Sequence, residues 1–247
     1  MEIRLFVFGV LLCMLLLPKA DFKTEQLKNP RVKEAYRLKQ QEVTETLKRN
    51  GIDPRTSEIY IRIFKKEKIL ELWGRNKNEN FVFLKDYKIC SSSGNLGPKR
   101  MVGDNQTPEG FYYINGFNPN SNFYLSLGIN YPNASDRILS KFKNPGGDIF
   151  IHGNCVTIGC IPITDDKIKE LYIYAVEAKN NGQMEIPVHI FPARMDDNGF
   201  KALTEKFASE KSLILFWENL KIGFNYFEKA RKLPSISVMK NGRYEFR

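Results

Sequence analysis

The spacing of apolar positions changes along the chain, from helical to strand-like and back to helical. Between residues 32 and 49 the apolar side chains fall on one side of a helix, and Gly51 is a natural stop. Between residues 59 and 64 an isoleucine stands at every second position, which predicts a strand. Short apolar runs between polar turns predict further strands at residues 69–73, 81–89, 111–114, 123–131, 148–152 and 186–191.

Helical spacing is clearest between residues 164 and 179. Ile168 and Leu171 share one apolar face there, and Thr164 stands where it could cap the first turn. These elements predict an α+β chain, in which a mainly β domain has flanking N- and C-terminal helices. The last elements predicted are helices at residues 200–208 and 213–229 and a closing strand at residues 236–239.

Residues 1–20 predict a signal peptide. Residues 5–17 are thirteen apolar residues in a row, preceded by Arg4, and Ala20 is a candidate cleavage site. The run is shorter than the roughly 20 residues that a membrane span needs. We therefore expect an exported protein of the periplasm or cell envelope. An uncleaved anchor, which would be the only contact with a membrane, and a buried core segment are the alternatives.

Composition and charge narrow the class of partner. The 247 residues are 42% hydrophobic and carry a formal charge of +10, which suits a globular protein with an anionic partner. Nucleic acid, acidic lipid and an anionic wall polymer all fit that charge. Because no run of Lys and Arg interleaves with aromatic residues, we expect no nucleic-acid partner. Four cysteines exclude a disulfide-dense scaffold.

Candidate chemistry concentrates in the segment HGNCVTIGC, residues 152–160. A loop between a strand and a helix could bring His152 back to Cys160, where the imidazole would accept the thiol proton. Gly159 lets the backbone approach a substrate carbonyl closely. The amides of Gly159 and Cys160 are therefore candidate oxyanion donors, and the following helix N-terminus could stabilise an anion nearby.

Other interpretations of these residues remain open. Cys160 could be a small buried apolar residue, or Cys155 could be the nucleophile in its place. Cys155 and Cys160 could also form a disulfide. Cys90 ends a strand and is expected in the core or at its rim. A zinc site would use His152, Cys155, Cys160 and His189, although the spacing matches no common structural zinc pattern, and we expect no metal. His189 stands in the middle of a strand, where a packed, hydrogen-bonded histidine is expected.

Three separated blocks resemble one known family. They are SSSGNLGPKRMVGDNQTPEGFYYI at residues 91–114, IFIHGNCVTIGCIPITDD at residues 149–166, and PVHIFPARM at residues 187–195. In order and spacing these blocks resemble the L,D-transpeptidases with a YkuD-type catalytic domain, most closely their YafK-like branch. The tail at residues 216–246 is similar to that branch as well.

The resemblance implies a β-sandwich or barrel-like catalytic domain at residues 56–195, between a helical segment at 21–55 and a helical extension at 196–247. It implies that the enzyme acts on peptidoglycan stem peptides without a cofactor. In this sequence Cys160 matches the nucleophile and His152 the general base. Further roles fall to residues in two loops: Gly153 would orient the imidazole, Gly159 would serve the oxyanion hole, and Lys99, Arg100, Thr107 and Thr157 would contact substrate.

One departure from the family leaves the outcome of the reaction open. The broader family has Ser/Thr-His-Gly-Cys at the nucleophile and often an arginine soon after it. Here Thr157, Ile158, Gly159 and Cys160 are followed by Ile161. Transfer to an amine, which gives crosslinks or an attached protein, and hydrolysis of wall-linked peptides or proteins share one acyl-enzyme. A non-catalytic wall-binding module is the alternative of another class.

Overall fold

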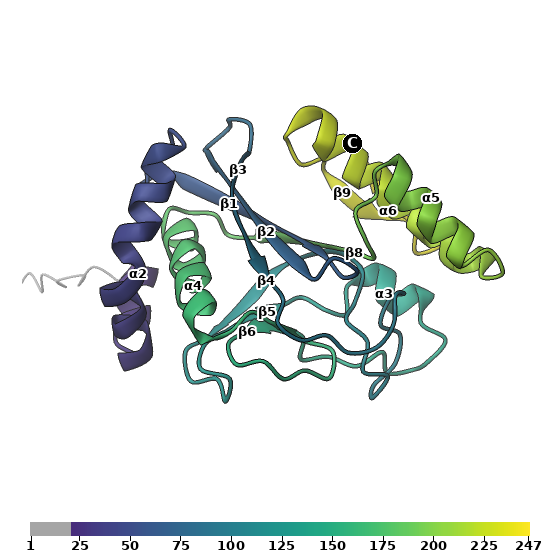
Figure 1. The fold of residues 1–247 in the computed structure, drawn as a ribbon, viewed down its shortest axis with the longest axis horizontal. Coiled ribbons are helices and arrows are strands. Elements are labelled where there is room, and N and C mark those ends of the chain that lie inside the picture. The colour runs from purple at the N-terminus through teal and green to yellow at the C-terminus, as the bar shows by residue number, and fades with distance from the viewer. Residues whose placement is uncertain (1–20) are drawn as a thin grey trace, which may run out of the picture.

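Eight strands form one curled sheet in the computed structural model, which describes residues 21–247 (Figure 1). Its strand order is β3-β2-β1-β8-β4-β5-β6-β7, and β9 and β10 form a separate hairpin. The strands are β1 (Ser57–Phe64), β2 (Ile69–Asn76), β3 (Val82–Lys88), β4 (Gly110–Asn118), β5 (Ser126–Ile129), β6 (Phe150–His152), β7 (Ile161–Pro162), β8 (Ile186–Phe191), β9 (Ile236–Val238) and β10 (Tyr244–Phe246). The mainly β fold with flanking helices is confirmed.

Helices cover both faces of this sheet. They are α1 (Phe22–Gln26), α2 (Pro30–Arg49), α3 (Ala134–Leu139), α4 (Asp165–Asn180), α5 (Asp197–Lys206) and α6 (Lys211–Ala230). In Figure 1, α2 and α4 lie on one side and α5 and α6 on the other. Within residues 21–247 no helix is both long enough and apolar enough to cross a membrane. The predicted signal peptide lies outside the described residues.

Strand β1 shows why two layers of helix are needed. Its isoleucines belong to the core beneath α2 and α4, whereas Tyr60 and Phe64 pack in the clusters that contain α6 residues. The strict alternation along β1 therefore separates two buried faces, not a buried and a solvated one. Arg62 lies on the α6 side, is 2% exposed, and pairs with Glu71 and with Glu228 of α6. Removing one partner of such a buried pair is costly.

The predicted elements are present, with three differences. Thr164 precedes α4 as predicted but does not cap it, because its φ is +74° and its side chain makes no capping hydrogen bond. The predicted strand at residues 123–131 is reduced to β5, since Tyr124 has φ of +71° and interrupts the extended backbone. Helices α1 and α3 and strands β7 and β10 were not predicted.

Candidate active site

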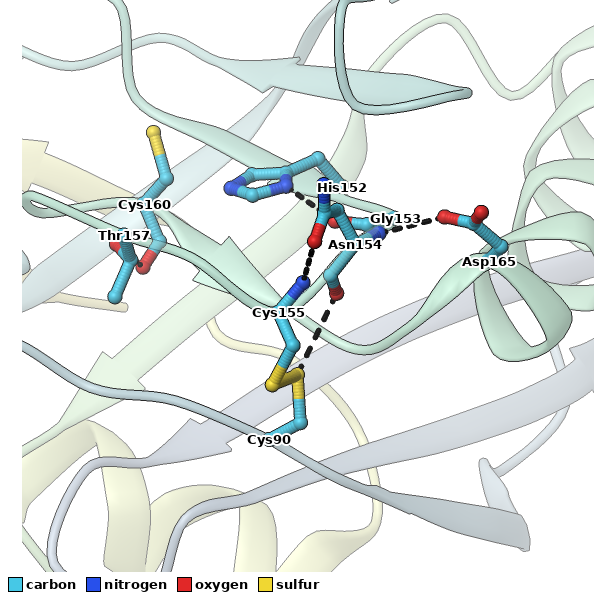
Figure 2. Close-up of a disulfide and its surroundings, with 8 residues drawn as sticks. All are labelled: Cys90, His152, Gly153, Asn154, Cys155, Thr157, Cys160 and Asp165. Carbon is cyan, nitrogen blue, oxygen red and sulfur yellow. Dashed lines mark hydrogen bonds between the residues drawn. A yellow bond between two sulfur atoms is a disulfide. The ribbon is translucent and has the colours of Figure 1, made fainter.

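The pairing of β6 with β7 brings the two ends of the segment 152–160 together. The strands are parallel, with Ile151 opposite Ile161 and His152 opposite Pro162. Cys160 immediately precedes β7, so by strand alternation it projects from the same face as His152, one diagonal step away. Figure 2 shows the thiol and the imidazole at the two ends of this loop. The sequence prediction that the loop returns Cys160 toward His152 agrees with this topology.

The Cys160 thiol is protonated in the free protein. Its side chain is partly buried, and burial raises the pKa of the thiol, with the Phe150 amide opposing that shift and Asp148 adding to it. The sulfur lies 3.6 Å from the Asp148 carbonyl oxygen. Within residues 21–247 no hydrogen bond joins it to the imidazole. The chain thus holds a neutral thiol whose side chain must turn toward His152 before a proton can pass.

His152 is held in the tautomer that a general base requires. The residue is 1% exposed, and its Nδ1 donates to the Gly153 carbonyl oxygen at 2.6 Å. A carbonyl only accepts, so the proton resides on Nδ1 and Nε2 remains an acceptor. Burial lowers the pKa of the imidazole, with the Gly153 hydrogen bond opposing, so the ring is neutral at pH 7. The Phe123 ring packs 4.6 Å away.

One peptide plane links His152 to a carboxylate. The Gly153 carbonyl accepts from His152, and the amide of the same peptide, that of Asn154, donates to Asp165 Oδ1 at 2.6 Å (Figure 2). Donation to a carboxylate polarises the peptide and increases the negative charge on its oxygen. A methyl group on the Gly153 Cα would lie 2.5 Å from Asp165 Oδ1 and 2.6 Å from the Phe123 carbonyl oxygen, which explains the glycine. The sequence analysis missed Asp165 as a site residue.

A disulfide joins the same loop to the central part of the chain. Cys155 is bonded to Cys90, which follows β3, with 5.6 Å between their Cα atoms. The alternative pairing of Cys155 with Cys160 is therefore wrong. Because its sulfur is already bonded, Cys155 is not a rival nucleophile in this state, and Cys160 is the free cysteine of residues 21–247.

The turn before Cys160 is stabilised by Thr157. Its hydroxyl accepts from the Gly159 amide at 3.0 Å and donates to the Cys160 carbonyl oxygen at 2.8 Å. Gly159 has φ of +134°, and a β-carbon there would lie 2.9 Å from the Gln106 carbonyl oxygen. Thr157 thus shapes the loop in this state, and the Gly159 amide must leave the threonine to bind an oxyanion. The oxyanion role of Gly159 and the substrate contact of Thr157 stay predictions.

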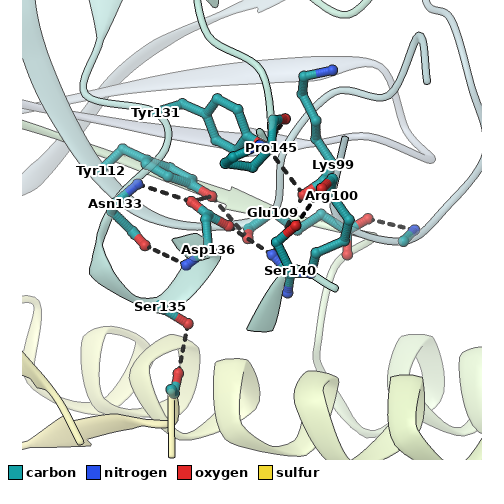
Figure 3. Close-up of polar contacts among 12 residues, drawn as sticks. Lys99, Arg100, Glu109, Tyr112, Tyr131, Asn133, Ser135, Asp136, Ser140 and Pro145 are labelled. Atoms are coloured by element: carbon teal, nitrogen blue, oxygen red, sulfur yellow. Dashed lines mark hydrogen bonds and ion pairs between the residues drawn. The ribbon is translucent and has the colours of Figure 1, made fainter. Parts of the chain in front are cut away.

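Lys99 and Arg100 are both paired with carboxylates. Lys99 Nζ lies 2.6 Å from Asp104, and Arg100 Nη1 lies 2.8 Å from the buried Asp136 of α3. Figure 3 shows these residues within a polar network that also includes Tyr131, whose hydroxyl donates to the Pro145 carbonyl. Arg100 thus holds the loop against α3, and Lys99 is paired within the loop, so the predicted contact with substrate carboxylates would require both to exchange partners.

Thr107 and Cys160 line one pocket of about 280 Å³. Lys66, Lys68 and Lys206 also line it, and the sequence analysis did not select them. They come from segments remote from residues 152–160 in sequence, so no local pattern could have found them.

The four zinc-ligand candidates are not assembled. Cys155 is in the disulfide, and His189 is 3% exposed in the middle of the sheet, where its Nδ1 lies 2.9 Å from the Tyr60 hydroxyl. Among residues 21–247 no group of three potential metal ligands lies close enough to hold an ion. His189 is thus a packed, hydrogen-bonded histidine, as expected.

Comparison with known proteins identifies the family. Residues 58–190 match the YkuD family of L,D-transpeptidase catalytic domains. The chain is 42% identical over 190 residues to YafK of Escherichia coli (strain K12), which is named as a candidate L,D-transpeptidase, and the match covers 76% of this chain and 73% of YafK. YafK of Escherichia coli O157:H7 gives the same values.

Solved structures include the helical cell shape determining protein Pgp2 from Campylobacter jejuni, with a TM-score of 0.45 and 18% identity over 74% of this chain and 73% of that chain. The family resemblance noted in the sequence rests on the profile match and on the YafK relatives. The chain therefore belongs to the L,D-transpeptidase family, whose YkuD domain is that of an acyltransferase acting on peptidoglycan peptides.

Proposed function

We propose that this protein is an exported cysteine L,D-transpeptidase in which Cys160 is the nucleophile and His152 the general base. The observation that carries the proposal is the pairing of β6 with β7, which places a free thiol diagonal to an imidazole with an unprotonated Nε2. The neighbouring cysteine of the loop is held in a disulfide, which leaves one sulfur for the chemistry.

Cys160 and His152 together can carry out an acyl transfer in which every proton and the leaving group are accounted for. His152 Nε2 takes the thiol proton as sulfur attacks a stem-peptide carbonyl, and the same proton passes to the leaving amine of D-alanine when the C–N bond breaks. An acceptor amine then attacks the thioester, gives its proton to His152, and releases the thiol. Water in place of the amine gives hydrolysis by the same route.

Because both the Cys160 thiol and the His152 imidazole are neutral, we infer that His152 acts as a base only when substrate is bound. The lowered pKa of His152 and the raised pKa of Cys160 both disfavour a preformed thiolate–imidazolium pair. A thiol protected in this way is less reactive toward adventitious electrophiles. The disulfide suits an oxidising compartment, which supports export to the envelope.

The testing experiment incubates the purified protein with isolated peptidoglycan and identifies the muropeptides by mass. New crosslinks or an attached acceptor would support transfer, and freed peptides would support the hydrolytic alternative. Cys160→Ala should abolish either change while keeping the folded circular dichroism spectrum and the Cys90–Cys155 bond. Retained turnover in Cys160→Ala would overturn the nucleophile assignment. Unchanged peptidoglycan with wild-type protein that still binds it would favour the wall-binding module.

A further inference from the structure

Several cationic side chains line the pocket that contains Cys160. Lys66 and Lys68 extend from the turn between β1 and β2, and Lys206 ends α5. Two elements far apart in sequence therefore deliver positive charge to the pocket that contains the thiol. Of the described residues that line it, none is acidic.

These three lysines differ from the fourth lysine of the pocket. Lys65 Nζ donates to Glu109 and to the carbonyl oxygens of Gly97 and Thr107, all within 2.9 Å, so its charge is satisfied inside the protein. In contrast, Lys66, Lys68 and Lys206 are exposed, and no ion pair to them is found within residues 21–247. The pocket thus has one structural lysine and three that are free to meet a ligand.

The rest of the pocket suits a peptide. Its apolar lining comes from Ile63, Ile89 and Ile161, and its rim from the polar segment 91–95. These isoleucines are nearly buried and give the pocket an apolar floor, so a bound peptide would lie along the polar segment 91–95 and beside the lysines. Carboxylates projecting from that peptide would then face Lys66, Lys68 and Lys206, because the other charged group of the lining, Lys65, is already satisfied inside the protein.

We propose that Lys66, Lys68 and Lys206 form an acyl-donor subsite that selects peptides bearing several free carboxylates over the same peptides in amidated form. The inference rests on the proposed function, since it places the scissile carbonyl at Cys160 and the free carboxylates of the donor beside Lys66, Lys68 and Lys206. Each exposed pair contributes modestly, so selectivity comes from three pairs acting together. Their attraction also weakens as salt is added.

Binding to a catalytically silent protein tests the subsite without requiring turnover. In the Cys160→Ala background, calorimetry compares a stem tetrapeptide with free carboxylates and its amidated form. Lys66→Gln/Lys68→Gln/Lys206→Gln should weaken binding of the free-carboxylate peptide about tenfold and leave the amidated peptide nearly unchanged. The matched control, Lys77→Gln/Lys232→Gln/Lys240→Gln, removes the same charge from exposed positions outside this pocket.

The outcomes separate this inference from the proposed function. Two results would overturn the carboxylate subsite. One is equal affinity of the free and amidated peptides for the Cys160→Ala protein with its three lysines intact. The other is equal weakening of binding by the control triple substitution. Selective binding that depends on the three lysines would support it, even if wild-type protein failed to modify peptidoglycan. That failure would count against the cysteine chemistry alone.

Discussion

The centre and the β6–β7 edge of the sheet each hold a buried histidine, and they use it differently. In the centre, His189 of β8 bonds to Tyr60 and is packed against aromatic rings, and burial lowers its pKa to about 3. At the edge, burial also lowers the pKa of His152, but its ring lies one strand from a free thiol. A lowered histidine pKa therefore reports burial at both places. The neighbouring reactive group, not the shift, distinguishes the candidate site.

The largest expected contrast is between substitutions of the two histidines. His152→Gln should lower the rate of peptidoglycan turnover by about 10²–10⁴-fold, because it removes the proton acceptor. His189→Gln should leave the rate within about threefold and instead reduce the free energy of unfolding by about 1–3 kcal/mol. Rates from muropeptide analysis and urea unfolding curves measure the two effects. If both variants were equally folded and lost activity equally, the two histidines would not differ in role.

The disulfide between the segment after β3 and the loop of residues 152–160 gives the next effect. Cys90→Ser/Cys155→Ser opens a crosslink between residues 65 positions apart and should cost about 2–4 kcal/mol in the free energy of unfolding. Urea unfolding with and without reductant measures it. Reductant should reproduce the loss in the wild type and change nothing in the double variant. Cys160→Ser is the control, and a similar loss there would mean that the free thiol, not the crosslink, stabilises the fold.

Acid should destabilise the centre through His189. Its ordinary pKa is 6.5, and in the folded chain it is about 3. Above pH 6.5 neither state is protonated. Below pH 6.5 the unfolded chain binds a proton that the folded chain does not, so the free energy of unfolding falls by about 1.4 kcal/mol per pH unit. Between pH 6.5 and 5 the loss is about 2 kcal/mol, and His189→Gln should reduce the slope of the free energy of unfolding by about 1.4 kcal/mol per pH unit.

The smallest expected effect concerns Asp165, which supports His152 at the β6–β7 edge. Asp165→Ala removes the carboxylate that accepts from Asn154, so the Gly153 carbonyl becomes a weaker acceptor and His152 a weaker base. Turnover at pH 7 should fall by about fivefold, and the pKa of His152 followed by NMR should fall further below 6.5. Asp166→Ala is the matched control, because that neighbouring carboxylate pairs with Lys39 instead. A shift of the His152 pKa in the control, or none in Asp165→Ala, would contradict the peptide link.

The elements of the centre were largely predictable, because local patterning determines them. The alternation in β1 and the helical spacing in α4 follow directly from burial. The covering of both faces of β1 by helices could not be predicted, since the partners of Tyr60 and Phe64 come from α6, more than a hundred residues away. Helix α3 was missed although Asn133 and Asp136 form a capping box, because polar loop chemistry surrounds it.

At the edge, sequence reasoning found the groups that lie within nine residues of each other and missed those that fold back from elsewhere. His152 and Cys160 stand in one segment, and parallel pairing brings its ends together. The partner of Cys155 could not be assigned, because sequence alone does not determine cysteine connectivity. Sequence reasoning also missed the pocket lysines, because only the tertiary structure brings Lys66, Lys68 and Lys206 to one pocket.

The Cys90–Cys155 bond has a consequence for maturation. Cytosolic thiols are kept reduced, so under the proposed export residues 152–160 would lack their crosslink until the chain reached an oxidising space. Without that bond the loop would keep its pairing in β6 and β7 and the hydrogen bond from the Asn154 amide to Asp165, but it would lose its covalent link to the segment after β3. Under the proposed export, oxidation would therefore fix this loop covalently to the fold only after the chain had left the cytosol.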